Sequence, residues 1–219
     1  MTQIPTSFDP ELSTVYQGHY GPFTITKEDR TGVIIYRTGL MIAALCLAIG
    51  TILISLDSNY PMHGQILTGL YVGFSLALGV SLAVIHIYMV ILHRFLQLCW
   101  LLGVIASISI AFTSTEPLVI AVYNHPIFLY GIGFTFVALT GIYFKEAFCF
   151  NRLETKILTP LVPFLLLGHL WGFLSGFQEQ VLLGAWSLLF CVFALRKTIQ
   201  EIPDDIGDKS VFDYLQSQH

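Results

Sequence analysis

The chain has 219 residues, of which 55% are hydrophobic and only 11% are charged, and its formal net charge is −4. A soluble domain carries about 25% charged residues, so this chain has too few polar side chains to cover a water-facing surface. The negative net charge and the lack of a basic cluster argue against a nucleic-acid partner. The composition therefore indicates an integral membrane protein in contact with lipid.

Six long apolar runs follow one another along the chain. A helix rises about 1.5 Å per residue, so about 20 residues cross a hydrocarbon core about 30 Å thick. The alternating pattern of a membrane β-barrel is absent, which leaves helices to satisfy the backbone amides in lipid. The sequence predicts an all-α polytopic bundle of six transmembrane helices, at residues 38–56, 66–93, 95–113, 127–148, 157–175 and 180–196.

The predicted organisation is an N-terminal tail over residues 1–36, a transmembrane domain over 37–197 and an acidic C-terminal tail over 198–219. The second and third helices are expected to form a tight hairpin around Arg94. All ten Lys and Arg residues fall before the first run, between the second and third runs, between the fourth and fifth runs, or after the sixth. By the positive-inside rule, this alternation predicts that both termini face the cytoplasm or the plastid stroma.

Three histidines within or beside the apolar runs are candidates for binding a pigment: His86, His93 and His169. A neutral imidazole can be an axial ligand to haem iron or to the magnesium of chlorophyll. The alternative is a histidine that only hydrogen-bonds to a neighbouring helix. A haem held by two histidines needs both at similar depth, and His86 and His169 are predicted to be offset. No residue set typical of a protein metal site or of a catalytic centre is present.

Glycines at a spacing of four residues occur in two of the apolar runs. Gly69 and Gly73 lie in the second run, and Gly168, Gly172 and Gly176 are predicted to form a double ladder of small residues in the fifth. Small residues at this spacing let helix backbones approach closely. We expect close packing between helices there, or a groove for a partner helix or a flat pigment.

The densest polar cluster joins the fourth and fifth runs and interleaves charged with aromatic side chains: Lys145, Glu146, Phe148, Phe150, Asn151, Arg152, Glu154 and Lys156. One interpretation is a belt of charges at the membrane interface. The other is a docking surface, because an aromatic and charged rim suits the recognition of proteins or lipid headgroups.

The stretch KEAFCFNRLETK at 145–156, with its continuation ILTPLVPFLLLGHL at 157–170, resembles an uncharacterised family of integral membrane proteins found in cyanobacteria and plastids. The resemblance extends over residues 20–200. The family has no established catalytic motif, so the resemblance implies no active-site residues. It implies a thylakoid location and a role in building or maintaining photosynthetic complexes, with photosystem II as the first choice.

The leading hypothesis is a non-enzymatic accessory or assembly factor that contacts photosystem subunits, and chlorophyll through His86, His93 or His169. A small-solute carrier or channel is the first alternative. It needs a polar path, whereas hydroxyls in these runs more often bond to carbonyls of their own helix. A haem-binding redox protein is the second alternative.

Overall fold

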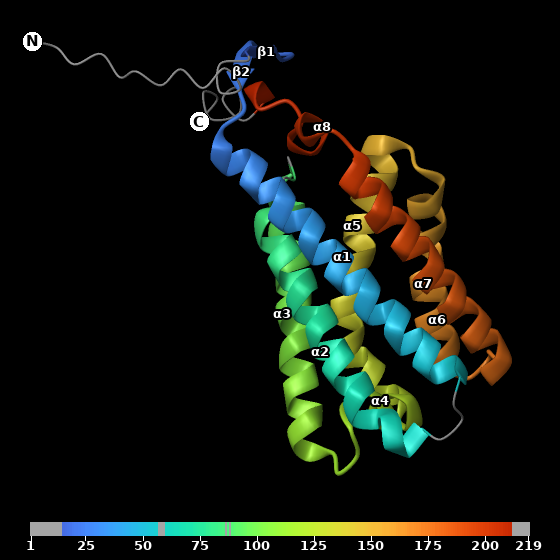
Figure 1. The fold of residues 1–219 in the computed structure, drawn as a ribbon. Coiled ribbons are helices and arrows are strands. Elements are labelled where there is room, and N and C mark those ends of the chain that lie inside the picture. The colour runs from blue at the N-terminus through green and yellow to red at the C-terminus, as the bar shows by residue number, and fades with distance from the viewer. Residues whose placement is uncertain (1–14, 57–59, 86, 88, 212–219) are drawn as a thin grey trace, which may run out of the picture.

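The computed structural model describes residues 15–56, 60–85, 87 and 89–211, and these residues form a bundle of long helices (Figure 1). Within the described residues, six helices are long and apolar enough to cross a membrane. They are α1 (Lys27–Leu56), α2 (Tyr60–Val84), α3 (Val90–Thr113), α5 (Leu129–Phe150), α6 (Leu153–Trp171) and α7 (Gly176–Ile199). The all-α architecture and the number of candidate spans agree with the prediction from the sequence.

Shorter elements complete the described part of the chain. The N-terminal side carries a hairpin of β1 (Val15–Gln17) and β2 (Pro22–Thr24), which pair antiparallel. The turn between α3 and α5 contains α4 (Leu118–Asn124) and the 3₁₀ helix η2 (Pro126–Phe128). The last helix, α8 (Ile202–Ile206), follows α7. The sequence analysis predicted none of these elements.

The six long helices pack as a closed ring. Each packs mainly against two others, in the order α1, α2, α3, α5, α6, α7 and back to α1, and α4 lies against α2 and α3. Apolar side chains such as Leu40, Leu78, Leu139 and Phe190 fill the middle of the ring. Most exposed large residues are also apolar, because the outer faces of these helices are made for lipid rather than water.

The first helix begins at Lys27, well before the predicted start at residue 38. The cause is a capping arrangement at its N-terminus. The Asp29 amide donates to the Thr26 hydroxyl (3.2 Å), and the Thr26 amide donates to the Asp29 carboxylate (2.8 Å). This reciprocal pair satisfies amides that a helix start leaves free. The helix therefore begins inside the segment predicted as the N-terminal tail and extends through residue 36.

The second and third helices meet at a different place from the predicted hairpin around Arg94. The helix α2 ends at Val84 and α3 begins at Val90, so Arg94 lies inside α3. The Leu82 carbonyl is in the last turn of α2, where a helix leaves carbonyls without intrahelical partners. The side chains of His93 and Gln97 bind this carbonyl, at 2.6 and 3.1 Å. These contacts close the turn between the two helices.

The three glycines Gly168, Gly172 and Gly176 do not form a ladder on one helix, which corrects the prediction. Gly172 has a φ of +69° and caps the C-terminus of α6, and Gly176 is the first residue of α7. In α2, Gly73 lies against Cys46 of α1, but Gly69 has open space beside it. Closer approaches occur at Gly79, which packs on the Trp100 ring, and at Gly103, which packs on Thr135.

The segments predicted as tails fold together at one end of the bundle (Figure 1). Ile25, Val33 and Ile206 form a small apolar core there. The His19 amide donates to the Asp208 carboxylate at 2.6 Å, and Lys209 pairs with Asp29 at 2.7 Å. The described part of the acidic tail is thus a structured cap over the first helix.

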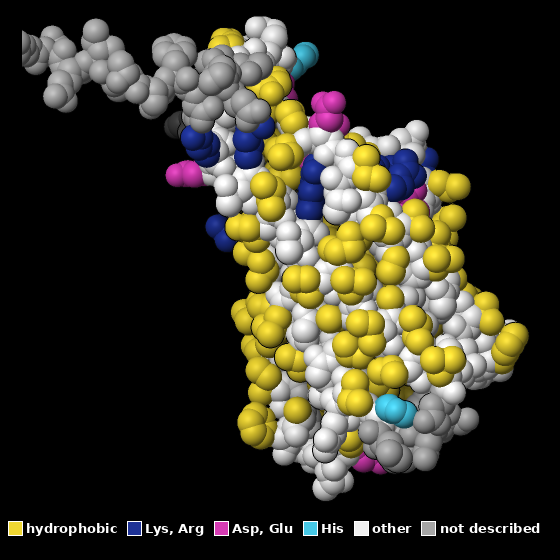
Figure 2. Space-filling view, viewed as in Figure 1, with side chains coloured by type: hydrophobic (Ala, Val, Ile, Leu, Met, Phe, Trp, Pro, Cys, Tyr) yellow, Lys and Arg dark blue, Asp and Glu magenta, His cyan; other side chains and the backbone are white. Residues whose placement is uncertain are grey.

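The basic residues gather at this capped end. Lys or Arg residues occur at the start of α1, α3 and α6 and at the end of α5 and α7. Figure 2 shows the dark blue side chains of the visible face near the hairpin, above a broad hydrophobic band. We refer to this as the basic end of the bundle and to the other as the non-basic end.

The contact between the hairpin and the C-terminal segment should depend on pH. The hydrogen bond from the His19 amide holds the pKa of the Asp208 carboxyl below its ordinary value. A lowered pKa in the folded state means that the contact is stabilising above the ordinary pKa and is lost as the pH falls through the lowered one. We expect the His19 and Tyr20 amides to exchange hydrogen several-fold faster in Asp208→Asn at neutral pH, as measured by NMR. Asp204→Asn, at an exposed position, is the control, and equal rates in both variants would contradict this account.

Candidate functional site

A network of buried charges lies at the basic end of the bundle. Lys197 of α7 is at its centre and pairs with Glu146 of α5 (Nζ to Oε2, 2.7 Å) and with Asp205 of α8. Lys145 pairs with the other Glu146 oxygen at 2.9 Å, and Arg37 of α1 pairs with Asp205 at 2.6 Å. The network therefore joins α1 and α5 to the consecutive helices α7 and α8.

The members of this network are almost completely removed from water. The side chains of Glu146 and Lys197 are 0% exposed, and that of Asp205 is 2% exposed. Removing charges from water costs several kcal/mol per ion unless partners compensate. Tyr36 supplies a further partner, because its hydroxyl donates to Glu146 at 3.1 Å. The Oε2 atom of Glu146 has no hydrogen bond of suitable angle and depends on the nearby Lys197 charge.

Three cations, Arg37, Lys145 and Lys197, face two carboxylates, so the network carries one surplus positive charge. The Phe150 ring lies beside this surplus. Its centroid is 4.5 Å from the Lys197 ammonium and 5.5 Å from that of Lys145. The negative face of an aromatic ring attracts a cation most strongly where water is excluded. Phe150 therefore belongs to the charge network.

A second set of contacts fixes the turn between α5 and α6 to the end of α7. Asn151 ends α5 in the left-handed conformation, with a φ of +52°, which asparagine tolerates better than most residues. Arg152 then donates to the Gln200 side chain at 2.6 Å, and Glu154 pairs with Arg196 at 2.9 Å. This turn is therefore held against the rest of the basic end.

The residues predicted as a docking surface separate into two groups. Glu146 and Glu154 are buried and paired, so they do not belong to an exposed surface, and Lys145, Phe150 and Arg152 are half-buried. This corrects the interpretation of Glu146 as part of an outer rim. Phe148, Asn151 and Lys156 are exposed, as a docking surface requires.

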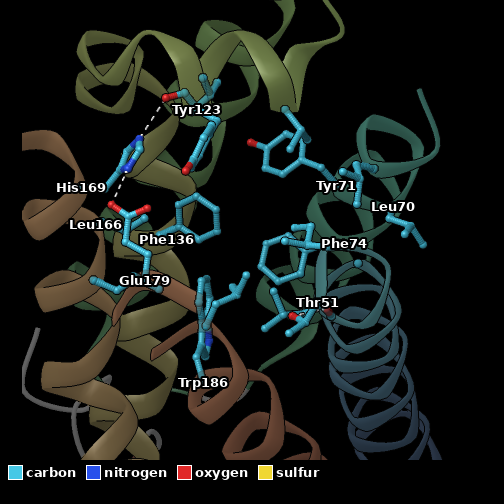
Figure 3. A pocket seen from close by; sticks show the side chains of 18 of the residues that line it. Thr51, Leu70, Tyr71, Phe74, Tyr123, Phe136, Leu166, His169, Glu179 and Trp186 are labelled. Carbon is cyan, nitrogen blue, oxygen red and sulfur yellow. Dashed lines mark hydrogen bonds and ion pairs between the residues drawn. The ribbon is translucent and has the colours of Figure 1, made fainter. Parts of the chain in front are cut away.

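An apolar pocket of about 310 Å³ lies in the non-basic half of the bundle (Figure 3). Side chains from α1, α2, α4, α5, α6 and α7 line it. Its inner wall consists of aromatic rings in mutual contact, with Phe136 5.9 Å from Phe74 and 5.5 Å from Trp186 between centroids. Pockets for small molecules have volumes of about 300–1,000 Å³ and mostly apolar linings. This pocket is at the lower end of that range.

A pair of titratable residues lies at one side of this pocket (Figure 3). His169 Nδ1 is 2.8 Å from Glu179 Oε1, and its Nε2 is 3.2 Å from the Tyr123 carbonyl. The imidazole also stacks on the Tyr123 ring at 5.0 Å. Glu179 is in the first turn of α7, which begins with a capping box between Ser175 and Gln178. The capping box of α7 and the stacking on Tyr123 therefore hold this pair in place.

The structure places the predicted pigment ligands apart. His86 lies outside the described residues. His93 is at the start of α3 and binds Leu82, whereas His169 is in the last turn of α6 at the opposite end, not near its middle as expected. Both His169 nitrogens have protein partners, so this side chain would have to leave one of them to bind a metal-centred pigment. Pigment binding stays a prediction from the sequence.

Sequence reasoning missed Asp205, Lys197 and Arg37 as network members and Glu179 as the partner of His169. The only local signal was the placement of ionisable groups inside or beside apolar runs, which is costly without partners. Several hydroxyls in the apolar runs bond to carbonyls of their own helices, as Ser55, Thr68 and Ser109 do.

Replacing Lys197 should destabilise the fold much more than replacing a lysine outside the network. Lys197→Met leaves two buried carboxylates without their shared cation, and breaking a buried pair costs about 3–5 kcal/mol. Lys156→Met, at an exposed position, should change stability by less than about 0.5 kcal/mol. Thermal unfolding of both variants in the same detergent measures this difference. Equal melting temperatures would show that the network does not stabilise the protein.

Comparison with known proteins gives one match. Neither the curated proteins nor the solved structures contain a match to this chain. A family described as uncharacterised integral membrane protein (DUF2301) matches residues 80–214. This segment contains α3, α5, α6, α7 and α8, and with them every member of the charge network except Arg37 and Tyr36. The match covers more than half of the chain, which therefore belongs to this family of integral membrane proteins.

Proposed function

We propose that this protein is a non-enzymatic accessory or assembly factor of a photosynthetic membrane complex, with photosystem II as the first candidate. It acts in the thylakoid membrane, with both termini on the cytoplasmic or stromal side. The observation that carries the proposal is an exposed aromatic and basic surface, fixed to the basic end of the bundle by the buried charge network. The resemblance of residues 145–170 to a thylakoid family supports the choice of complex.

This surface, which we call the rim, consists of Phe144, Phe148, Leu153 and Lys156. The Phe144 and Phe148 rings stack with centroids 6.2 Å apart, on the outer side of α5. Phe148 is 83% exposed and Leu153 is 69% exposed. The side chains project where the α5–α6 turn meets the basic end, at the level expected for lipid headgroups. A second membrane subunit can contact the rim there without inserting between the helices.

The rim has the composition of a protein interface rather than of an ordinary surface. Large aromatic side chains supply much of the binding energy of interfaces, because they bury a large area with few rotatable bonds. Glu146 and Glu154 are buried and paired, so the exposed charge beside the aromatic rings is positive. The proposed partner is therefore a membrane subunit with an acidic loop on the cytoplasmic or stromal side.

The contacts of the α5–α6 turn favour tight binding. Ordering flexible side chains and loops at an interface costs free energy that rigid surfaces avoid. Arg152 and Glu154 flank Leu153 and are held by Gln200 and Arg196. The rim is thus presented in one arrangement before a partner arrives.

Changing the rim should remove the partner without removing the protein. We expect Phe148→Ser combined with Lys156→Glu to reduce the recovery of photosystem II subunits at least tenfold when the tagged protein is purified from cyanobacterial thylakoids. The reason is the loss of a buried aromatic contact and of charge complementarity. Quantitative mass spectrometry of the purified material measures this recovery.

The matched control is Leu188→Ser with Lys27→Glu. It makes the same kinds of change on the lipid-facing side of α7, where Leu188 is 66% exposed, and at the start of α1. This variant should recover the same subunits as the natural protein. Recovery of the natural protein only as a free monomer would contradict the proposal. Recovery of anionic lipid alone, lost in the rim variant, would show that the rim binds headgroups instead.

A further inference from the structure

The pocket in the non-basic half of the bundle is polar at one end and aromatic at the other. It extends along α7 from Glu179 to Trp186, a distance of about 10 Å at 1.5 Å per residue. Glu179 is in the first turn of α7 and His169 in the last turn of α6, so the polar side is near the membrane boundary. The aromatic wall of Phe74, Phe136 and Trp186 lies deeper in the bundle. An amphiphile in a bilayer has this same orientation, with its polar head at the boundary.

The hydrogen bonds of His169 determine which head group the polar side accepts. A carbonyl only accepts hydrogen bonds, so the nitrogen facing the Tyr123 carbonyl carries a hydrogen. The 2.8 Å contact between Nδ1 and Glu179 Oε1 needs one further hydrogen, on either atom. In both cases His169 and Glu179 share one proton and are neutral as a pair. The second carboxyl oxygen of Glu179 then remains as an acceptor.

The neutral His169–Glu179 pair favours a neutral ligand over a cation or an anion. A cation would find no net negative charge to balance its own, because the His169–Glu179 pair is neutral as a whole. An anion would lie against the Glu179 carboxyl group without a free cation. A neutral hydroxyl group can donate to the second Glu179 oxygen and leave the pair intact. Among the described residues that line the pocket, the other polar side chains with a hydroxyl or amide group are Thr51, Tyr71, Tyr123 and Gln180. Thr51 donates to the Leu47 carbonyl of its own helix (2.8 Å), and Tyr71 bonds to Ser107 at 2.8 Å.

We propose that this pocket binds one neutral lipophilic phenol or alcohol, whose hydroxyl donates to Glu179 and whose apolar ring system packs against Phe74, Phe136 and Trp186. The volume of about 310 Å³ fits a body of at least two fused rings, since an engineered cavity of about 150 Å³ in another protein holds one benzene molecule. Aromatic walls favour a ring, which stacks or meets them edge to face. The site is independent of the rim and of any photosystem partner.

Binding of 2-naphthol and of 2-methoxynaphthalene to the purified full chain in lipid nanodiscs tests this proposal. The two probes have the same ring system, and only the first has a hydroxyl donor. Equilibrium dialysis against empty nanodiscs of the same lipid separates binding to the protein from partition into lipid. We expect saturable binding of one 2-naphthol per chain, at least tenfold tighter than that of the methyl ether.

Two variants, Leu183→Trp and Glu179→Leu, test whether the probe binds in this pocket. Leu183→Trp fills the pocket and should abolish saturable binding, whereas Leu188→Trp, on the lipid-facing side of the same helix, should leave it unchanged. Glu179→Leu should remove the preference for the hydroxyl probe, so that both probes bind equally. Circular dichroism and size exclusion confirm that each variant is folded, and Glu179→Leu tests the site independently if Leu183→Trp does not fold.

Three results would overturn the proposal. Non-saturable uptake equal to that of empty nanodiscs would mean partition into lipid only. Equal affinity of the natural protein for both probes would remove the role of Glu179. Tighter binding of 2-naphthylmethylammonium than of 2-naphthol would show that the site prefers a cation.

Discussion

The ion pairs of Lys197 with Glu146 and Asp205 are the interaction on which the basic end of this protein depends. Lys197 has no access to water and no other anionic partner among the described residues, so its charge is tolerated only while both carboxylates remain in place. Asp205 belongs to α8, and its position brings the C-terminal segment over the ends of α1 and α7. The same contacts hold Glu146 and Phe150 at the end of α5, which also carries the aromatic residues of the exposed rim. The stability of the basic end, the folded C-terminal cap and the proposed interaction surface thus all depend on the ion pairs of Lys197.

The two ends of the bundle differ in the chemistry that they offer. The basic end has its charges paired internally and exposes aromatic and cationic side chains, which suits contact with another protein. Among the described residues, the non-basic half carries few charges, and the His169–Glu179 pair lies at the side of an apolar pocket. A small protein with a rigid docking end and a separate lipophile site could hold a partner and a ligand at once.

The six helices could be predicted from the sequence because the length of an apolar run is a local property that the bilayer thickness sets. The helix ends could not be predicted as closely, since the capping of α1 by Thr26 and Asp29 and the closing of the α2–α3 turn by His93 depend on a few polar contacts. The charge network could not be predicted, because Arg37 and Asp205 are separated by most of the chain. Local patterns identified Lys145, Glu146 and His169 as unusual, but only the fold shows that Glu146 is buried and that His169 has Glu179 as its partner.

A double-mutant cycle on Glu146 and Lys197 tests the central claim most directly. The free energy of unfolding is measured in one detergent for the natural protein, for Glu146→Gln, for Lys197→Gln and for the double variant. If the two side chains form the pair on which the basic end depends, the double variant should lose less stability than the sum of the singles, by at least about 1 kcal/mol. Single losses that add to within about 0.5 kcal/mol would mean that the two residues act independently, and would contradict this account.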